Sequence, residues 1–329
     1  MSRLRPLLAT LRIANAPSVV SNVWLGYMVG WVVWGGDLHR FEPSQWILIA
    51  VLSISGVCLY FAGNLANDWF DQEWDRVRRP ERALPSGLFR PASYLAGSIF
   101  LGGVGLVLAS AAGVHCLISA LAILVLIAIY TRFHKQSIWA VVPMGLCRVG
   151  LYVMGFFASW PPSEAIQRAS RHMNLADLMG PPLLTLGAMS CGLFCYIAGL
   201  SLSARYEGME NPPKGPRVIA WGLVAMPLVA TGCRFTGFPV FSLIGMVPFA
   251  VWLGFSLTIF RKPIPRYVSA LLAGIPLVDF IAAAPIALGA DKMHIQQSLG
   301  ELPHFVALLT VPLIAFVLGR ALQKLAPAT

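Results

Sequence analysis

The chain has 329 residues, of which 57% are hydrophobic and only 12% are charged, and its mean hydropathy is +0.72. Soluble domains carry about 25% charged residues, so this composition excludes an ordinary cytosolic protein, a disordered chain and a nucleic-acid-binding protein. The net charge of +10 points first to membrane topology, because basic residues gather in the cytoplasmic loops of membrane proteins. The six cysteines lie mostly in apolar runs without a CxxC pair, which indicates small buried side chains and no disulfide framework.

Apolar runs near the ~20-residue length of a membrane span recur from the first to the last part of the chain. They are continuous, whereas barrel strands would alternate, so they predict an all-α polytopic bundle of nine to ten transmembrane helices in one domain, 1–329. The first basic stretch leads into a full-length span without a small-residue cleavage site, so no signal peptide is expected. The expected spans are 17–36, 45–65, 92–112, 114–130, 138–158, 183–203, 217–233, 239–260, 268–290 and 303–322.

The distribution of Lys and Arg among the loops predicts the orientation. With the N-terminus inside, the inside segments hold 18 of the 24 basic residues and the outside segments hold 5. The excess of basic residues is on the inside, as in proteins whose cytoplasmic loops are basic. We therefore expect a multi-pass protein of the cell membrane with both termini in the cytoplasm.

An acidic stripe follows the second span, in the cytoplasmic stretch 66–91. Asn67, Asp71 and Asp75 stand at i, i+4 and i+8, and Asp68 stands three residues before Asp71, so all four side chains share one helical face. Like charges at these spacings repel, so the stripe needs a cation. Carboxylate and amide oxygens suit Mg²⁺, which often binds through one or two carboxylates and a substrate phosphate.

A basic segment follows the stripe and contains Arg79 and Arg82. Arginine holds anionic groups through charge-assisted hydrogen bonds, so these residues are candidates for binding a phosphate. The alternative interpretation is a solvated helix end with mixed charge, anchored by interfacial tryptophans and neutralised by the arginines.

The pattern NDxxDxxxD followed by R-x-L-P-S-G, over Asn67–Gly87, resembles the first signature of UbiA-type intramembrane prenyltransferases. The resemblance implies a helical bundle with a lateral opening to lipid and a cytoplasmic polar cap. It also implies a prenyl diphosphate bound through Mg²⁺. The metal ligands that it implies are Asn67, Asp68, Asp71 and Asp75. The pair that resembles the family's diphosphate-contacting Tyr–Lys segment, with one extra residue between its members, is Tyr130 and Lys135.

The chain departs from the family pattern after the sixth span, in the second motif loop 203–217. The family generally carries a second aspartate cluster there, but this chain offers only Glu207 and Glu210, and Arg205 stands where an acid is expected. Arg205 could replace a second Mg²⁺ as a direct diphosphate ligand beside Glu207, since a guanidinium pairs with phosphate through two hydrogen bonds. Alternatively, the site no longer ionises a diphosphate, or Arg205 only sets topology. The S-x-x-A-R-x-E pattern also resembles a divergent family branch found in bacterial eboshi-type clusters.

Two charged residues, Arg148 and Asp279, lie inside apolar runs at similar depth. Ionisable side chains at membrane depth are costly and are functional candidates by default. They are open to two interpretations, a buried ion pair or a polar contact at the floor of a substrate cavity. The histidines have no ligand spacing, so neither a zinc site nor a catalytic triad is expected.

The sequence thus predicts a Mg²⁺-dependent integral-membrane prenyltransferase acting on a prenyl diphosphate and a hydrophobic acceptor, aromatic or lipid-like, among membrane lipids and without nucleic acid. The alternative is a non-catalytic or transport-related lipid-binding protein that keeps the fold, and the missing second acidic motif favours it. The candidate catalytic residues are Asp71, Asp75, Lys135 and Arg205. The candidate diphosphate-binding residues are Arg79, Arg82, Tyr130, Lys135, Arg205 and Glu207.

Overall fold

The computed structural model describes residues 4–34, 42–160, 175–205, 214–235, 237, 239–294 and 302–326. These residues form α-helices joined by short connections and 3₁₀ turns, without a strand among them, which confirms the predicted all-α class. The short helices at one end of the bundle are α1 (Leu4–Thr10) and α4 (Gln72–Arg78). The long helices are α2 (Ala16–Val33), α3 (Pro43–Phe70), α5 (Pro91–Ala111), α6 (Val114–Phe133), α7 (Val141–Ala158), α9 (Leu175–Arg205), α10 (Lys214–Ala230), α11 (Pro239–Thr258), α12 (Ile264–His294) and α13 (Leu302–Leu325).

Within the described part of the chain, nine helices are long and apolar enough to cross a membrane. They coincide with the first nine expected spans, and the tenth expected span falls on α13. Apolar side chains such as Ile99, Phe100 and Val107 are exposed on the outside of α5, as the lipid-facing side of a membrane helix requires. The protein is therefore a multi-pass membrane protein, as the sequence predicts.

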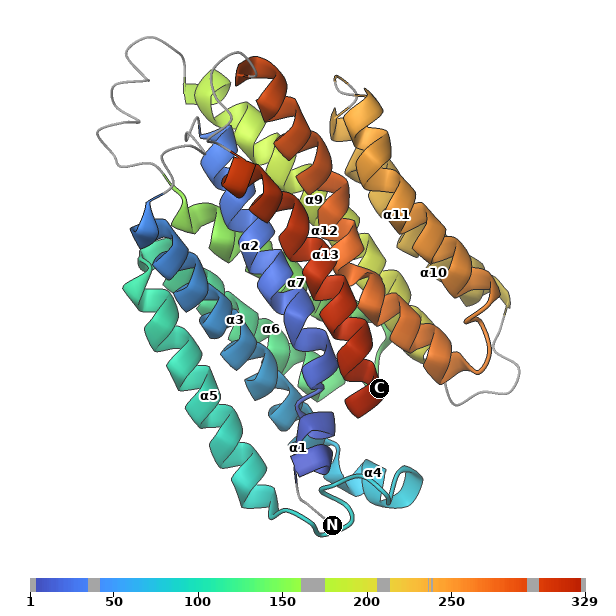
Figure 1. Ribbon diagram of the computed structural model, residues 1–329. Helices are drawn as coiled ribbons and strands as arrows, with labels where there is room; N and C mark the ends of the chain where they lie inside the picture. The colour runs from blue at the N-terminus through green and yellow to red at the C-terminus, as the bar shows by residue number, and fades with distance from the viewer. Residues whose placement is uncertain are drawn as a thin grey trace.

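The helices lie side by side in a bundle, with α2, α7, α9 and α12 near its centre (Figure 1). Burial distinguishes the central helices from the peripheral ones. In the most apolar part of each span, 89% of α12 and 72% of the stretch that contains α2 are buried, against 22% of α5. Both chain ends lie at the same end of the bundle, next to α1 and α4 (Figure 1). There the Arg5 Nε donates a hydrogen bond of 3.2 Å to the Leu325 carbonyl. This closure agrees with an even number of crossings.

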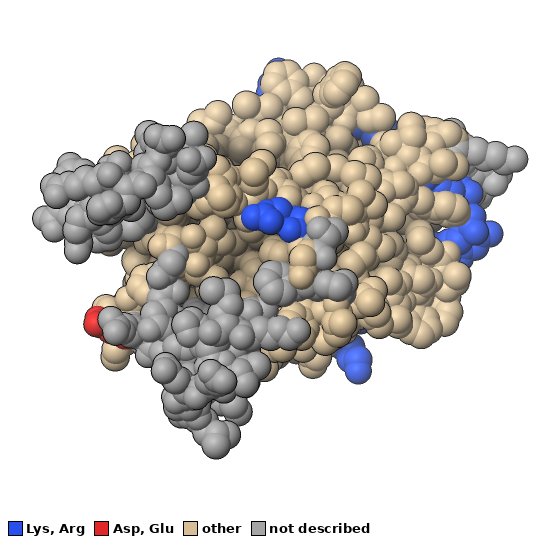
Figure 2. All heavy atoms as spheres, turned by 90° about the horizontal axis from the view of Figure 1, so that it is seen from above, with Lys and Arg blue, Asp and Glu red and all other residues tan. Residues whose placement is uncertain are grey.

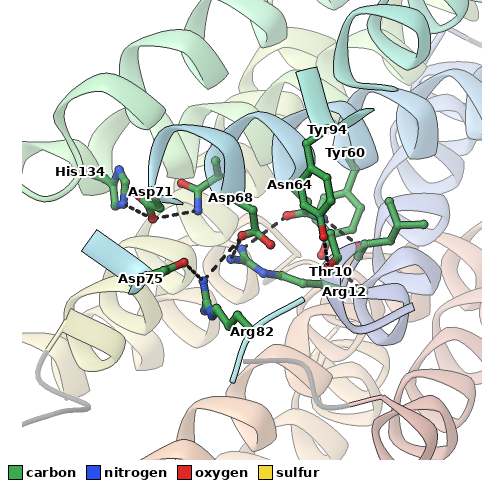
Figure 3. Close-up of polar contacts among 12 residues, drawn as sticks. Thr10, Arg12, Tyr60, Asn64, Asp68, Asp71, Asp75, Arg82, Tyr94 and His134 are labelled. Atoms are coloured by element: carbon green, nitrogen blue, oxygen red, sulfur yellow. Dashed lines mark hydrogen bonds and ion pairs between the residues drawn. The ribbon is translucent and has the colours of Figure 1, made fainter. Parts of the chain in front are cut away.

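Charge is unevenly placed along the bundle. Seen from the end opposite the termini, the described surface is mostly uncharged, with a few separate Lys and Arg side chains and one acidic side chain at its edge (Figure 2). The aspartates of the acidic stripe and the basic residues that contact them lie at the terminal end instead, around α1 and α4 (Figures 1 and 3). The two ends of the molecule therefore differ in chemistry, and the candidate site belongs to the charged one.

Helices α2 and α7 approach each other at two glycines. A Cβ added at Gly26 would lie 2.4 Å from the Tyr152 carbonyl oxygen, and one at Gly155 would lie 2.3 Å from the Val23 carbonyl oxygen. Small residues allow membrane helices to pack backbone against backbone. This approach fixes the α2 face that carries Asn22 against α7.

We expect Gly155→Ala to force α2 and α7 apart, because the added methyl group meets backbone that cannot move by itself. Overpacking of this kind costs about 1–3 kcal/mol, so the purified full-length protein should unfold at a lower temperature. Gly103→Ala, in α5, is the matched control, since nothing lies within 4 Å of its added Cβ. Equal unfolding temperatures for the two variants would contradict the close approach of α2 and α7.

Candidate metal and anion site

The acidic stripe lies across the boundary between α3 and α4. Helix α3 ends at Phe70, but the helical hydrogen bonds continue: the Asp71 N–H donates to the Asn67 carbonyl at 2.9 Å, and the Asp75 N–H to the Asp71 carbonyl at 2.8 Å. The side chains therefore stay on one side, as the spacing predicts. Asn67, Asp71 and Asp75 are only 7%, 7% and 2% exposed, which does not fit a solvated helix end.

The segment after α4 is held by an apolar anchor. Leu84 is buried in a small cluster with Leu65 of α3 and Tyr94 of α5. Gly87 closes the following turn with a φ of +76°, a left-handed conformation that glycine adopts without strain, and its N–H donates to the Leu84 carbonyl. The L-P-S-G part of the motif thus fixes the position of Arg82 just before it.

Two arginines that are far apart in the sequence, Arg12 before the stripe and Arg82 after it, contact the stripe (Figure 3). Arg82 pairs with Asp75, with Nη1 2.9 Å from Oδ2, and lies 3.6 Å from an oxygen of Asp68. Arg12, between α1 and α2, approaches the same Asp68 oxygen at 3.8 Å and donates to the Asn64 side-chain oxygen at 3.4 Å. These contacts place two guanidinium groups beside two carboxylates.

The connection after α6 brings Lys135 and His134 to Asp71. Lys135 Nζ lies 2.8 Å from one oxygen of Asp71, and His134 Nε2 lies 3.2 Å from the other. Burial opposes ionisation of this carboxyl, but the hydrogen bonds from His134 and Lys135 outweigh it and hold the pKa of Asp71 below its usual value. The Tyr130 ring stacks on His134 at 5.0 Å, and Lys135 Nζ lies 3.8 Å over the Trp74 ring. Tyr130 and Lys135 therefore lie beside the stripe.

Arg205, at the end of α9, contacts the same connection from outside the stripe. Its Nη1 donates to the carbonyl oxygens of His134 at 3.1 Å and Ser137 at 3.0 Å. The side chain thus fixes the backbone that carries His134 and Lys135, instead of reaching a carboxylate itself.

The remaining candidate residues lie differently. The Arg79 N–H donates to the Asp75 carbonyl at 2.7 Å, while its side chain has no recorded partner among the described residues. Glu207 lies outside the described residues, as does Glu210. Sequence reasoning assigned Arg12 only to topology and set His134 aside for lack of ligand spacing. No spacing rule connects either residue with the stripe, because both reach it through tertiary packing.

The oxygen atoms of the stripe fit a hard cation. Asn67 Oδ1, Asp68 Oδ1 and Asp75 Oδ1 are buried and have no hydrogen-bond donor in the described structure. A buried acceptor without a partner is costly, and a cation satisfies it. Among the described residues, no three His, Cys, Asp or Glu side chains are grouped so that they alone could hold a metal ion. Mg²⁺ does not need one, because one or two carboxylates together with substrate phosphates suffice.

Arg148 and Asp279 also have a defined arrangement in the bundle interior. The Arg148 Nη1 donates to the Ser18 hydroxyl at 3.0 Å and to the Asn22 side-chain oxygen at 3.1 Å. The Asn22 amide in turn donates to both oxygens of Asp279, at 2.9 and 3.0 Å. A direct ion pair between Arg148 and Asp279 is therefore a wrong expectation, because Asn22 lies between the two charges.

A multi-pass helical membrane protein with this acidic and basic site at one end corresponds to a known class, and comparison with known proteins identifies it. The model of the UbiA prenyltransferase family matches residues 23–272. The chain belongs to this family, which confirms the resemblance of the motif. The narrower resemblance to the eboshi-type branch stays a prediction.

Two curated relatives are digeranylgeranylglyceryl phosphate synthases. The one from Metallosphaera sedula is 32% identical over 134 residues, which are 41% of this chain and 44% of the relative. The one from Methanothrix thermoacetophila is 36% identical over 94 residues, or 29% and 33% of the two chains. The chain thus matches less than half the length of these relatives.

A solved structure of a digeranylgeranylglyceryl phosphate synthase is similar to this chain with a TM-score of 0.57, at 19% sequence identity. The similarity covers 89% of this chain and 100% of that one, and it confirms the fold.

We expect Arg205→Ala to release the backbone between α6 and α7, because two hydrogen bonds to its carbonyls are lost. Amide hydrogen exchange should accelerate in the peptide that contains Lys135, Gln136 and Ser137. Each bond from a charged donor contributes about 1.5–3 kcal/mol, so acceleration of roughly tenfold or more is expected. Arg132→Ala, at an exposed arginine in the last turn of α6, is the control, and parent-like exchange in Arg205→Ala would contradict the assigned role.

Proposed function

We propose that the protein is a Mg²⁺-dependent integral-membrane prenyltransferase, which transfers a prenyl group from a prenyl diphosphate to a hydrophobic acceptor. One observation carries the proposal: buried aspartates on a single stripe are surrounded by cationic side chains from three separate segments of the chain. Membership of the UbiA prenyltransferase family and the relatives named as synthases support it.

The donor diphosphate would occupy the space between the carboxylates and the cations. Asn67, Asp68, Asp71 and Asp75 would hold Mg²⁺, and two of their buried oxygens, Asn67 Oδ1 and Asp75 Oδ1, have no partner among the described residues. When bound, the ion neutralises the diphosphate and makes it a better leaving group. Arg82 and Lys135 now contact carboxylates and would exchange them for phosphate oxygens, to which both make strong charge-assisted bonds.

The transfer reaction needs charge stabilisation more than acid–base chemistry. The bond between the allylic carbon and the diphosphate oxygen breaks, and its electron pair leaves with the diphosphate. The acceptor's nucleophilic atom forms a bond to that carbon and releases its proton. Fixed cations beside the developing charge are the largest catalytic contribution in such sites. Lys135 would therefore act on the diphosphate directly, Asp71 and Asp75 would act by holding the metal, and Arg205 would act through the backbone of the Lys135 segment.

The non-catalytic lipid-binding alternative keeps one observation in its favour. Arg205 contacts backbone carbonyls, so the position of the family's second acidic cluster provides neither a carboxylate nor a free guanidinium in the described structure. A protein of this kind would bind a prenyl diphosphate or another isoprenoid lipid and release no diphosphate from it.

The site end of the bundle is proposed to face the cytoplasm, with both termini on that side. The 18 to 5 division of basic residues and the location of both termini beside the acidic stripe support this orientation. Single cysteines at Glu81, near the stripe, and at Arg234, between α10 and α11, test it. A membrane-impermeant maleimide applied to intact cells should label only the Arg234 position, and labelling of the Glu81 position alone would reverse the orientation.

We expect Asp75→Ala and Asp71→Ala each to abolish Mg²⁺-dependent binding of geranylgeranyl diphosphate, since each removes a carboxylate that is proposed to hold the metal. Calorimetric titration of the purified protein should show a loss of affinity of about 100-fold or more, as expected when a buried charge pair is broken. Glu73→Ala is the control, because Glu73 is exposed in the same helix and pairs only with Arg76.

The same preparations separate the two functions. Release of inorganic diphosphate in the presence of membrane lipids supports the transferase. Metal-dependent binding with no release over many hours supports the lipid-binding alternative. Unchanged affinity in folded Asp75→Ala and Asp71→Ala would exclude the stripe as the diphosphate site in either case.

A further inference from the structure

A cluster of three arginines lies at the terminal end of the bundle, around α11, α12 and α13 and apart from the acidic stripe at α3 and α4 (Figure 1). Arg261 lies between α11 and α12, Arg266 in the first turn of α12, and Arg320 near the end of α13. The proposed transfer chemistry uses none of them. Arg320 also lies beyond residues 23–272, which the family model matches. The arginine cluster therefore needs an explanation of its own.

Each arginine of the cluster lies over an aromatic ring. The guanidinium carbon of Arg261 is 5.0 Å from the centre of the Trp221 ring on α10. The guanidinium carbons of Arg266 and Arg320 lie 4.8 and 5.6 Å from the centre of one and the same ring, that of Phe260. An aromatic ring attracts a guanidinium without neutralising its charge. The rings thus hold three cations in place and leave their charge available.

No carboxylate neutralises the arginine cluster within the described part of the chain. The arginines of the acidic stripe, Arg12 and Arg82, each approach an aspartate, whereas none of the three arginines here takes part in such a pair. Arg320 Nη1 donates to the Gln323 side-chain oxygen at 2.7 Å, which is a neutral partner. Because Arg266 and Arg320 share one ring, two like charges lie close together and repel each other. An anion bound between them would remove this repulsion.

The surroundings of the cluster indicate which kind of anion it meets. Apolar side chains are exposed next to it, Ile259 at the end of α11 and Val317 and Leu318 on α13. Such side chains on a membrane helix face acyl chains, while the long basic side chains near helix ends reach the level of the headgroups. Basic clusters in this position bind anionic phospholipid headgroups. The charge and the apolar border together fit a lipid better than a soluble anion.

We propose that Arg261, Arg266 and Arg320 form a binding site for the headgroup of an anionic phospholipid from the surrounding leaflet. The phosphate would lie between Arg266 and Arg320 and accept charge-assisted hydrogen bonds from both, with Arg261 beside it. The bound lipid would join α12 to α13, where Gln323 Nε2 already donates to the Ser269 carbonyl at 2.8 Å. The lipid is held without reacting, so the inference goes beyond the proposed transferase and does not depend on it.

Arginines that only set topology lead to a different expectation. They would attract anionic lipids diffusely, and every exposed arginine at this end of the bundle would contribute equally. A site requires that the two arginines sharing the Phe260 ring contribute much more than an isolated one. Arg132, in the last turn of α6, is the matched comparison, because it is exposed and its guanidinium carbon lies 5.9 Å from the centre of the Phe133 ring. Among the described residues, no second arginine lies over that ring.

The test measures the binding of single lipids to the purified full-length protein in a neutral detergent by native mass spectrometry. Phosphatidylglycerol is compared with phosphatidylcholine of the same acyl chains, so that the two lipids differ in the net charge of the headgroup. Each basic residue near a membrane surface strengthens the binding of an anionic lipid about fivefold. We therefore expect the parent to bind its first phosphatidylglycerol about tenfold or more tightly than its first phosphatidylcholine.

Variants assign this preference to the cluster. Arg266→Gln and Arg320→Gln should each reduce it about fivefold, whereas Arg132→Gln should keep it. Arg320 also lies over the Trp252 ring at 5.2 Å, so Arg320→Gln removes a contact inside the bundle, and the exposed Arg266 tests the site without that loss. An excess of glycerol 3-phosphate, which carries the phosphate without acyl chains, should displace little of the bound lipid.

Equal binding of the two lipids by the parent overturns the inference, and so does a parent-like preference in Arg266→Gln. An equal loss of preference in Arg132→Gln and Arg266→Gln would show diffuse attraction instead of a site. Complete displacement of phosphatidylglycerol by glycerol 3-phosphate would show that the cluster binds a soluble phosphate and not a lipid.

Discussion

The mutual repulsion of Asp68, Asp71 and Asp75 is the constraint on which this end of the molecule depends. Three carboxylates on one side of a helix end, largely shielded from water, are unstable without cations. The chain supplies these cations from positions far apart: Arg12 before α2, Arg82 after α4, and Lys135, next to His134, after α6. The stripe therefore determines where three otherwise independent connections must meet.

The supporting contacts are of two kinds. Leu84 buries its side chain against Leu65 and Tyr94, so an apolar contact holds the segment with Arg82 in place. Arg205 holds the segment with Lys135 through backbone carbonyls, so a polar contact fulfils the same purpose on the other side. Deeper in the bundle, the close approach of α2 and α7 keeps Asn22 between two buried charges. Each contact positions a charged group without touching the proposed substrate.

Periodicity and composition were sufficient to predict the bundle, its spans and the shared face of the stripe, because these depend on local spacing and on apolar length. They were not sufficient for the partners of the stripe. Arg12 lies about sixty residues before Asp71, and nothing in the sequence distinguishes it from an arginine that only sets topology. Arg205 was predicted as a diphosphate ligand, and its hydrogen bonds to carbonyls could not be predicted, because they depend on how α9 ends against the α6–α7 connection. The depths of Arg148 and Asp279 were predictable from helix rise, whereas the intervening Asn22 was not.

The pairing of Asp75 with Arg82 and of Asp71 with Lys135 has a thermodynamic consequence. In the proposed site, a metal ion that binds Asp71 or Asp75 would weaken the hold of that carboxylate on Lys135 or Arg82, and a phosphate that binds Lys135 or Arg82 would free the carboxylate. Each ligand would therefore favour the binding of the other, so the coupling free energy is negative and binding is positively cooperative. Such coupling is reciprocal, so the ion should tighten the diphosphate by the same factor by which the diphosphate tightens the ion. Free Mg²⁺ alone would then occupy little of the protein, and the donor substrate itself would set how much metal the site holds.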